Sequence, residues 1–302
     1  MKNLYKRTDI FSCHHDSHRG FKNRISVYHI LKEKKCFPQG CFYFRWKCKL
    51  LSKQKKCHRG FRQVGRKCFG CRYFYEEKVH NYPELQIDEE QYLNFLEELD
   101  KFEDWLEQIQ YRDIEISGIV SGIKPHFQKR IYPKAEHLSF KGYILIFKNI
   151  FLDRYHMDDY VYGLISSNYY QKIKLGRGTK IEAIARLKTA QGRLILTNFR
   201  RIEIIEEGEP PYWNDQQVLI VRETATEFNE QPESCVQCPF GALVDVLYLK
   251  NHHSHSRRSL LCLKGNLDYR DCYVRAEYCG LEKDAHEIYS TSCQSGKKTF
   301  HL

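Results

Sequence analysis

Two Cys-x-x-Cys elements constrain what this chain can fold into more than any other feature. They are Cys68-Phe-Gly-Cys71 and Cys235-Val-Gln-Cys238, and they flank a β-rich segment. Two thiols separated by two residues can reach one metal ion from a single tight turn, and two such turns complete a tetrahedral thiolate site. The spacing therefore predicts that one metal ion ties together the two ends of the intervening domain.

The C-terminal third offers a separate grouping. Cys262 and Cys272 follow the second pair and complete a set of four thiols without the first pair. Zinc is the predicted ion, because nothing else in the sequence indicates redox work. An iron–sulfur cluster is the alternative, since Pro239 follows Cys238 as a proline follows a ligand cysteine in many iron–sulfur proteins.

The N-terminal region holds further thiols. The spacing Cys36-x4-Cys41-x6-Cys48 is compatible with a second ion, and the histidines near Cys13 are interpreted as solvated side chains. The chain has thirteen cysteines and no apolar stretch after its first residues. We therefore expect a cytoplasmic protein whose cysteines bind metal rather than form disulfides, and no membrane association.

Charge divides the chain in two. Residues 1–80 hold 21 Lys and Arg against 5 Asp and Glu, whereas the remaining residues hold 28 against 33. A basic region on a near-neutral body is typical of proteins that bind a polyanion. We expect residues 1–67 to form a basic arm, with or without a fixed fold.

Apolar periodicity predicts one helix followed by five strands. Residues 88–110 carry apolar side chains at spacings of three and four with an acidic opposite face, which indicates an amphipathic helix. Alternation then predicts strands over about 114–123, 138–151, 160–166, 179–188 and 194–205, with a short helix over 168–174. Gly118 and Gly122 inside the first strand indicate a bend or bulge. Residues 242–249 and 259–263 predict a hairpin, and the last 30 residues look weakly ordered.

Residues 112–206 resemble the oligonucleotide/oligosaccharide-binding (OB) fold. The resemblance rests on the five strands, the glycine-bearing first strand and the helix between the third and fourth strands. It implies a nucleic-acid partner, preferably single-stranded, because unpaired bases stack on aromatic side chains beside cations. The segment holds 17 Lys and Arg against 9 Asp and Glu. The predicted contacts are Phe127, Lys129, Arg130, Tyr132 and Lys141, supported by Arg200 and Arg201.

A distant resemblance to RecB-like nucleases supplies an alternative. In that family an aspartate ends one strand and a Glu-x-Lys pair lies on the next; Asp245 and Lys264 match. The glutamate position holds Cys262, which cannot replace a hard magnesium ligand. This departure argues against phosphodiester cleavage. There is also no phosphate loop or dinucleotide fingerprint, so no nucleotide cofactor is expected.

Together these patterns predict a mainly β protein with one amphipathic helix, in which a five-stranded OB-like barrel is flanked by a cysteine-rich metal-binding module. The expected divisions are 1–67, 68–111, 112–206, 207–275 and 276–302. The predicted function is nucleic-acid binding with a structural metal. The alternatives are an iron–sulfur protein, redox-active or nuclease-related, and a module that binds another protein without nucleic acid.

Overall fold

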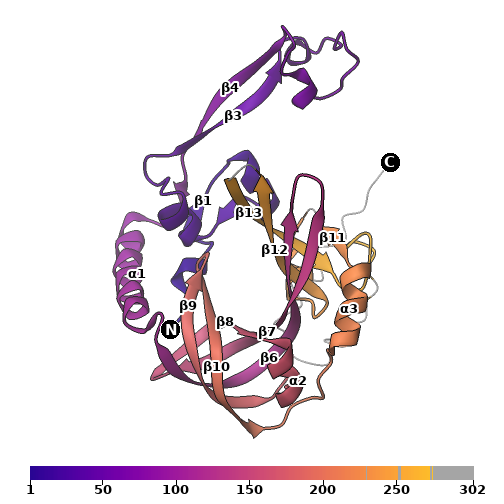
Figure 1. The fold of residues 1–302 in the computed structure, drawn as a ribbon. Helices are drawn as coiled ribbons and strands as arrows, with labels where there is room; N and C mark the ends of the chain where they lie inside the picture. The colour runs from indigo at the N-terminus through magenta and orange to yellow at the C-terminus, as the bar shows by residue number, and fades with distance from the viewer. Residues whose placement is uncertain (229, 251–252, 273, 275–302) are drawn as a thin grey trace. The chain divides into compact units, whose positions relative to one another are not determined.

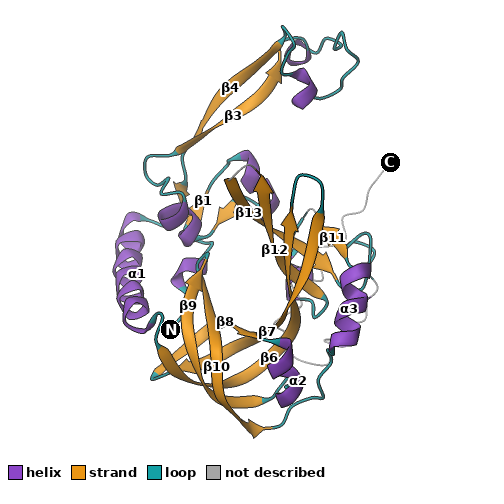
Figure 2. Ribbon diagram, in the orientation of Figure 1, coloured by secondary structure: helices purple, strands orange, loops and turns teal. Residues whose placement is uncertain are grey.

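The computed structural model describes residues 1–228, 230–250, 253–272 and 274 (Figure 1). These residues form two compact units. One comprises Leu4–Trp105, and the other comprises Met1–Asn3 with the described chain from Leu106 onward. Most of the described structure is strand, with few helices (Figure 2). The tail predicted to be weakly ordered, from residue 275, lies outside the described residues.

The larger unit is built on a closed five-stranded barrel. Its strands are β6 (Asp113–Ile131), β7 (Glu136–Leu152), β8 (Tyr155–Ile165), β9 (Lys180–Ala190) and β10 (Arg193–Glu206). The order is β6-β7-β8-β10-β9, and β9 pairs back onto β6 to close the barrel. Strands β8 and β10 run parallel, and the other barrel pairs are antiparallel. Helix α2 (Ser167–Ile173) connects β8 to β9. The closed barrel is confirmed, and its order is compatible with the OB-like barrel predicted for residues 112–206.

Alternation along the strands fills the barrel. On β7 the side chains of Tyr143, Leu145 and Phe147 are fully buried, whereas their neighbours along the strand are partly exposed. This is the period-two pattern of a sheet with one face toward a core. The predicted irregularity in the first strand is confirmed, because the β6–β7 register shifts between Gly118 and Val120 and again between Val120 and Gly122. A Cβ at Gly118 would lie 2.9 Å from Ile150 Cγ1, so a side chain there would disturb the pairing.

The predicted C-terminal hairpin extends the barrel sheet. Strands β12 (Gly241–Lys250) and β13 (His253–Cys262) pair antiparallel, and β11 (Thr226–Phe228) adds to β13. Strand β12 also pairs in parallel with the end of β6, from Gln128 to Ile131. The sheet therefore has eight strands among the described residues, of which five close the barrel. Helix α4 (Glu233–Gln237) precedes β12.

The smaller unit includes the region predicted to be a basic arm. Residues 4–67 form part of a folded unit, with β1 (Phe11–Ser12), β2 (Arg24–Ile25), β3 (Cys41–Cys48) and the helical turns η1 (Leu4–Lys6), η2 (Asp16–Phe21), η3 (Tyr28–Glu33), η4 (Leu51–Lys53) and η5 (Arg66–Cys68). Strand β5 (Glu84–Leu85) pairs with β1, and β4 (Phe74–Asn81) pairs with β3.

Helix α1 (Glu89–Ile109) follows, as predicted. Its apolar stripe includes the buried side chains of Phe95, Leu99 and Phe102. Its acidic face contacts the N-terminal segment: Glu103 accepts a hydrogen bond from the Tyr5 hydroxyl and pairs with Lys32 at 2.6 Å. This carboxylate therefore holds two N-terminal side chains against the helix.

Helix α3 (Asp215–Thr224) is attached to the barrel through one carboxylate. Asp215 accepts hydrogen bonds from Tyr143 Oη, Ser167 Oγ and Gln171 Nε2. Burial by itself raises the pKa of Asp215, but these three donors lower it below its ordinary value of 3.8. The ionised carboxylate therefore stabilises the attachment of α3.

We expect Asp215→Asn to lower the free energy of unfolding at neutral pH by about 1–3 kcal/mol, because three hydrogen bonds lose their charged acceptor. A carboxyl whose folded pKa is depressed stabilises the fold above its unfolded pKa and loses that contribution as the pH falls through the folded value. The difference between wild type and variant should therefore shrink below about pH 4. Urea denaturation from pH 7 to pH 2 measures this. Asp158→Asn, at an exposed aspartate, is the control and should follow the wild-type profile; equal pH profiles for all three proteins would contradict the assignment.

Candidate nucleic-acid interface and cysteine clusters

Four cysteines gather at the end of the β3–β4 ribbon. Cys48 ends β3, and Cys57, Cys68 and Cys71 lie in the loop that leads to β4. All four line one small pocket, together with Leu51, Arg59, Phe61, Gln63, Val64 and Phe74. The Arg59 backbone N–H donates to Cys57 Sγ at 3.4 Å, which orients that sulfur. We call Cys48, Cys57, Cys68 and Cys71 the ribbon cluster. The spacing C-x8-C-x10-C-x2-C is the sequence signal for this cluster, whereas the sequence-based prediction joins Cys68 and Cys71 to the distant second pair.

A second group lies beside the barrel, and we call it the barrel-side cluster: Cys235, Cys238, Cys262 and Cys272. Cys262 ends β13 opposite Gly241, the first residue of β12. Backbone and side-chain donors point at two of the sulfurs: Phe240 N–H donates to Cys238 Sγ at 3.4 Å, and Asn266 Nδ2 donates to Cys272 Sγ at 3.1 Å.

The four thiols of the barrel-side cluster are close enough to affect each other's ionisation. Burial and the neighbouring Cys238, Cys272 and Cys262 together raise the pKa of Cys235 to about 11. Burial also raises the pKa of Cys238. Lys124 on β6 donates to the carbonyls of Val236 and Gly241, both at 2.8 Å, so a cation lies at the edge of this cluster. The members are those of the C-terminal grouping predicted from sequence.

The two Cys-x-x-Cys pairs belong to different units of the chain, and each is grouped with two other cysteines of its own unit: Cys48 and Cys57 for the first pair, Cys262 and Cys272 for the second. The single ion shared by both pairs stays a prediction that the structure does not test. As the side chains stand, no group of three or more His, Cys, Asp or Glu among the described residues has an arrangement that could hold a metal ion. The metal-binding module predicted from the sequence therefore stays a prediction.

The ribbon also carries an exposed row of aromatic side chains. Phe42, Phe44 and Trp46 alternate along one face of β3, exposed by 53%, 53% and 40%. Strand alternation places their rings on the same side. Lys78, opposite Phe44 on β4, places its ammonium 4.2 Å from the centre of the Phe42 ring. We call Phe42, Phe44 and Trp46 the aromatic stripe. The sequence-based prediction does not include the aromatic stripe, although the alternation of Phe42, Phe44 and Trp46 in the sequence is a signal for it.

On the barrel, the outer face of β8 and β10 holds an arginine without a carboxylate partner. The Arg193 guanidinium lies 5.5 Å from the centre of the Tyr162 ring and has no hydrogen bond or ion pair in the described part of the chain. Burial and the nearby Arg258 together lower the pKa of Arg193 to about 10, although Tyr162 and the more distant Asp245 oppose the shift. Arg258 itself pairs with Asp245 at 2.9 Å. A half-buried guanidinium beside a second arginine favours an anion on this face.

The residues predicted to contact nucleic acid differ in their burial and in their ion pairs. The prediction for Phe127 is wrong, because its side chain is fully buried and offers no face to a base. Lys129 pairs with Glu136 at 2.7 Å and Glu227 at 2.8 Å, and Arg200 pairs with Asp113 at 3.1 Å. These carboxylates already compete for both cations. The remaining predicted contacts lie at the surface or are half-buried: Arg130, Tyr132, Lys141 and Arg201.

The residues behind the nuclease alternative are engaged in other contacts. Asp245 lies within β12 rather than at its end, and its carboxylate binds Arg258. The Lys264 ammonium lies 4.4 Å from the centre of the Phe240 ring. Neither contact is one that a magnesium-dependent centre requires.

Comparison with protein-family models, with curated proteins and with solved structures gives no match. No helix in the described residues is long and apolar enough to cross a membrane. The fold and the site therefore define a class by architecture alone: a mainly β protein with a closed five-stranded barrel.

Proposed function

We propose that this protein binds single-stranded nucleic acid, with the aromatic stripe as the main stacking surface and the barrel face around Arg193 as a second contact. The observation that carries the proposal is the stripe. Three large aromatic rings stand exposed along one strand in the most basic part of the chain. Aromatic faces beside cations are what unpaired bases and their phosphates bind.

The chemistry of the stripe favours single strands over duplex. Bases in a duplex already stack on each other, so their faces are closed to protein side chains, whereas unpaired bases can stack on Phe42, Phe44 and Trp46. Lys78, beside the stripe, supplies a cation for the phosphates. On the barrel, Arg193 and Tyr162 repeat the combination of cation and ring on a smaller scale.

We also propose that the ribbon cluster and the barrel-side cluster each bind a structural zinc ion. An isolated two-stranded hairpin is marginally stable in water. Strands β3 and β4 form a two-stranded sheet, and four thiols line a pocket at its end. Four thiolates at tetrahedral distance are the usual ligand set of closed zinc sites. Binding requires the side chains to close around the ion and lose their protons. An iron–sulfur cluster is the competing occupant of four thiolates.

Removal of the stripe provides the first test. Replacing Phe44 and Trp46 together by alanine should weaken binding of a labelled oligothymidylate by one to two orders of magnitude, because each base that loses its stacking partner costs about 1–3 kcal/mol. Fluorescence anisotropy at fixed salt measures the change. Phe151→Ala, at a comparably exposed ring on β7, should leave affinity unchanged. Unchanged affinity in the double variant, or equal wild-type affinity for duplex and single strand, would overturn the proposal.

A variant of Arg193 tests the contribution of the barrel face separately from that of the ribbon. Arg193→Gln should reduce affinity several-fold and reduce its salt dependence, since one phosphate contact and its counterion release are lost. Stability should change little, because the lost contact with the Tyr162 ring is offset by removal of a half-buried cation that has no ion pair in the described part of the chain. Arg154→Gln removes the same charge from an exposed position and is the matched control. Equal affinities of the two variants across a salt titration would remove the barrel face from the interface.

Metal analysis tests the structural sites. Protein purified without oxygen should contain zinc, and Cys71→Ser and Cys238→Ser should each lose about one ion per chain by mass spectrometry of the metal, since each removes one of four ligands. Removal of zinc from the ribbon cluster should weaken oligonucleotide binding, because the stripe loses its support. A brown protein that contains iron and sulfide would show that an iron–sulfur cluster, and not zinc, occupies the cysteine sites. Metal-free protein that binds oligonucleotides at full affinity would contradict it.

A further inference from the structure

We propose a third metal site, of mixed ligands, in the N-terminal unit: Cys13, His18, Cys36 and Cys41 bind a zinc ion. We call these four residues the N-terminal cluster. All lie within the unit Leu4–Trp105, and none of them belongs to the two sites proposed above. This inference stands apart from nucleic-acid binding, since it concerns only how the N-terminal unit is held together.

The first observation is a buried ring nitrogen without a partner. The His18 side chain is 8% exposed, and its Nδ1 atom has no hydrogen-bond partner. Most buried polar atoms in proteins are hydrogen-bonded, because an unsatisfied one costs about 1–3 kcal/mol. A neutral imidazole nitrogen with a free lone pair is also the form in which histidine binds zinc.

The neighbouring histidines are different, and this selects His18. The rings of His15 and His29 lie 5.2 Å and 5.1 Å from the His18 ring. His15 Nδ1 is bonded to the Ser17 hydroxyl at 2.8 Å, and His29 Nδ1 to Glu33 at 3.0 Å. Each neighbour therefore has a partner for its Nδ1 atom, whereas His18 has none.

The second observation is that three thiols lie close to one another, and that the backbone of one of them, Cys13, contacts His18. Cys13 is fully buried, Cys36 is 3% exposed and Cys41 begins β3. Burial and the neighbouring Cys41 and Cys13 together raise the pKa of Cys36 to about 11, which places the three thiols close to one another. Burial raises the pKa of Cys41 as well, with Cys13 as the next contributor. Burial lowers the pKa of His18 to about 4, while the Cys13 backbone opposes this. Cys13 is thus a near neighbour of the other three side chains.

Backbone contacts fix the loops that carry the four residues. Cys13 N–H donates to the Asn23 carbonyl at 2.9 Å, and Asn23 N–H donates to the His18 carbonyl at 3.3 Å, which closes the first loop. In the second loop Gly40 N–H donates to the Cys36 carbonyl at 2.6 Å. Gly40 adopts φ +81°, a conformation that a side chain would strain.

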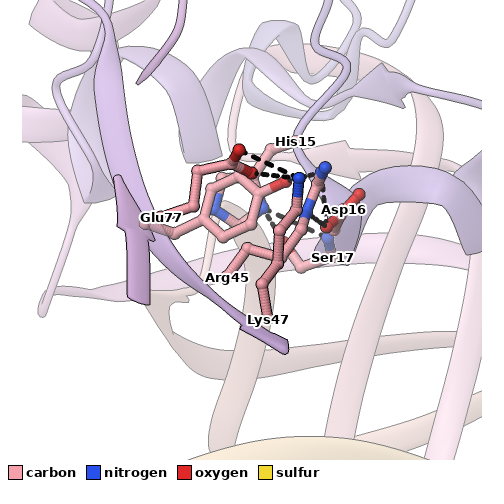
Figure 3. A network of polar contacts seen from close by, with 7 residues as sticks. His15, Asp16, Ser17, Arg45, Lys47 and Glu77 are labelled. Atoms are coloured by element: carbon pink, nitrogen blue, oxygen red, sulfur yellow. Dashed lines mark hydrogen bonds and ion pairs between the residues drawn. The ribbon is translucent and has the colours of Figure 1, made fainter. Parts of the chain in front are cut away.

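A charged clamp joins the first loop to the ribbon (Figure 3). The Arg45 guanidinium on β3 donates to Asp16 Oδ2 at 2.9 and 3.1 Å, and Asp16 lies between His15 and Ser17 in the chain. Lys47 on the same strand pairs with Glu77 on β4 at 2.8 Å. The clamp therefore holds the segment that carries His18 against the strand that begins with Cys41.

The ligand set suits zinc. Three thiolates and a neutral imidazole around Zn²⁺ leave one net negative charge. Lys34 is close enough to affect the ionisation of both Cys41 and His18, so a cation is present to offset that charge. The donor atoms do not converge on a point as they stand, so binding draws the side chains inward. All eleven cysteines in the described part of the chain then belong to one of three four-ligand groups.

The test uses the full chain loaded with Zn²⁺ without oxygen. His18→Gln and Cys41→Ser should each contain one zinc ion fewer per chain than wild type, while the barrel-side and ribbon ions remain. His14→Gln is the matched control, because His14 is exposed and four residues away. Equal zinc content in His18→Gln, His14→Gln and wild type would overturn the site.

A spectroscopic measurement on wild type guards against a variant that does not fold. X-ray absorption at the zinc edge should show imidazole scattering in wild type, since the ribbon and barrel-side clusters contribute sulfur only. Only sulfur ligands in the wild-type spectrum would overturn the mixed site and leave the all-cysteine sites standing. Imidazole scattering with no zinc at the other two clusters would support it while refuting them.

Discussion

The structure of the larger unit depends on which strands pair with each of the two edges of β6. Each residue of a strand can pair with only one neighbouring strand on each edge, so two strands can share an edge only by pairing with different segments of it. One edge of β6 is occupied by β7 over almost its full extent. The other edge pairs with β9 from Asp113 to Ile119, which closes the barrel, and with β12 from Gln128 to Ile131. The register shifts around Gly118 and Gly122 fall where the first pairing ends, so the strand bends there and its second half is free for β12.

This division brings the cysteines of the C-terminal third to the barrel. Strand β12 lies beside β6, and β13 lies beside β12, so Cys262 at the end of β13 comes opposite the segment that follows Cys238. Lys124 lies on β6 just beyond the bend and hydrogen-bonds the backbone on both sides of Cys238. Barrel closure and thiol grouping therefore follow from two successive pairings along one edge of the same strand.

The N-terminal unit faces a different physical problem. Its strands are short or form a two-stranded ribbon, and neither arrangement buries much apolar surface by itself. Its seven cysteines are concentrated in two places, at the end of the ribbon and around His18. Metal ligation at both places would supply the stability that a small core cannot. The aromatic stripe then stays open to solvent because stability does not require its burial.

The local spacing of apolar residues was enough to predict α1, the five barrel strands and the C-terminal hairpin, because helical and strand periodicity depends only on residues near each other in the sequence. The C-terminal cysteine grouping was also visible from spacing. Three things were decided only by tertiary structure. Strand alternation allows Phe127 to lie on either face, and tertiary packing decided that its side chain is buried, next to the ring of Phe140. The union of Cys48 and Cys57 with Cys68 and Cys71 required the pairing of β3 with β4. Burial decided the isolation of His18 Nδ1: His15 and His29 find partners two and four residues away, whereas the fold encloses His18 Nδ1 without one, and no sequence pattern marks that difference.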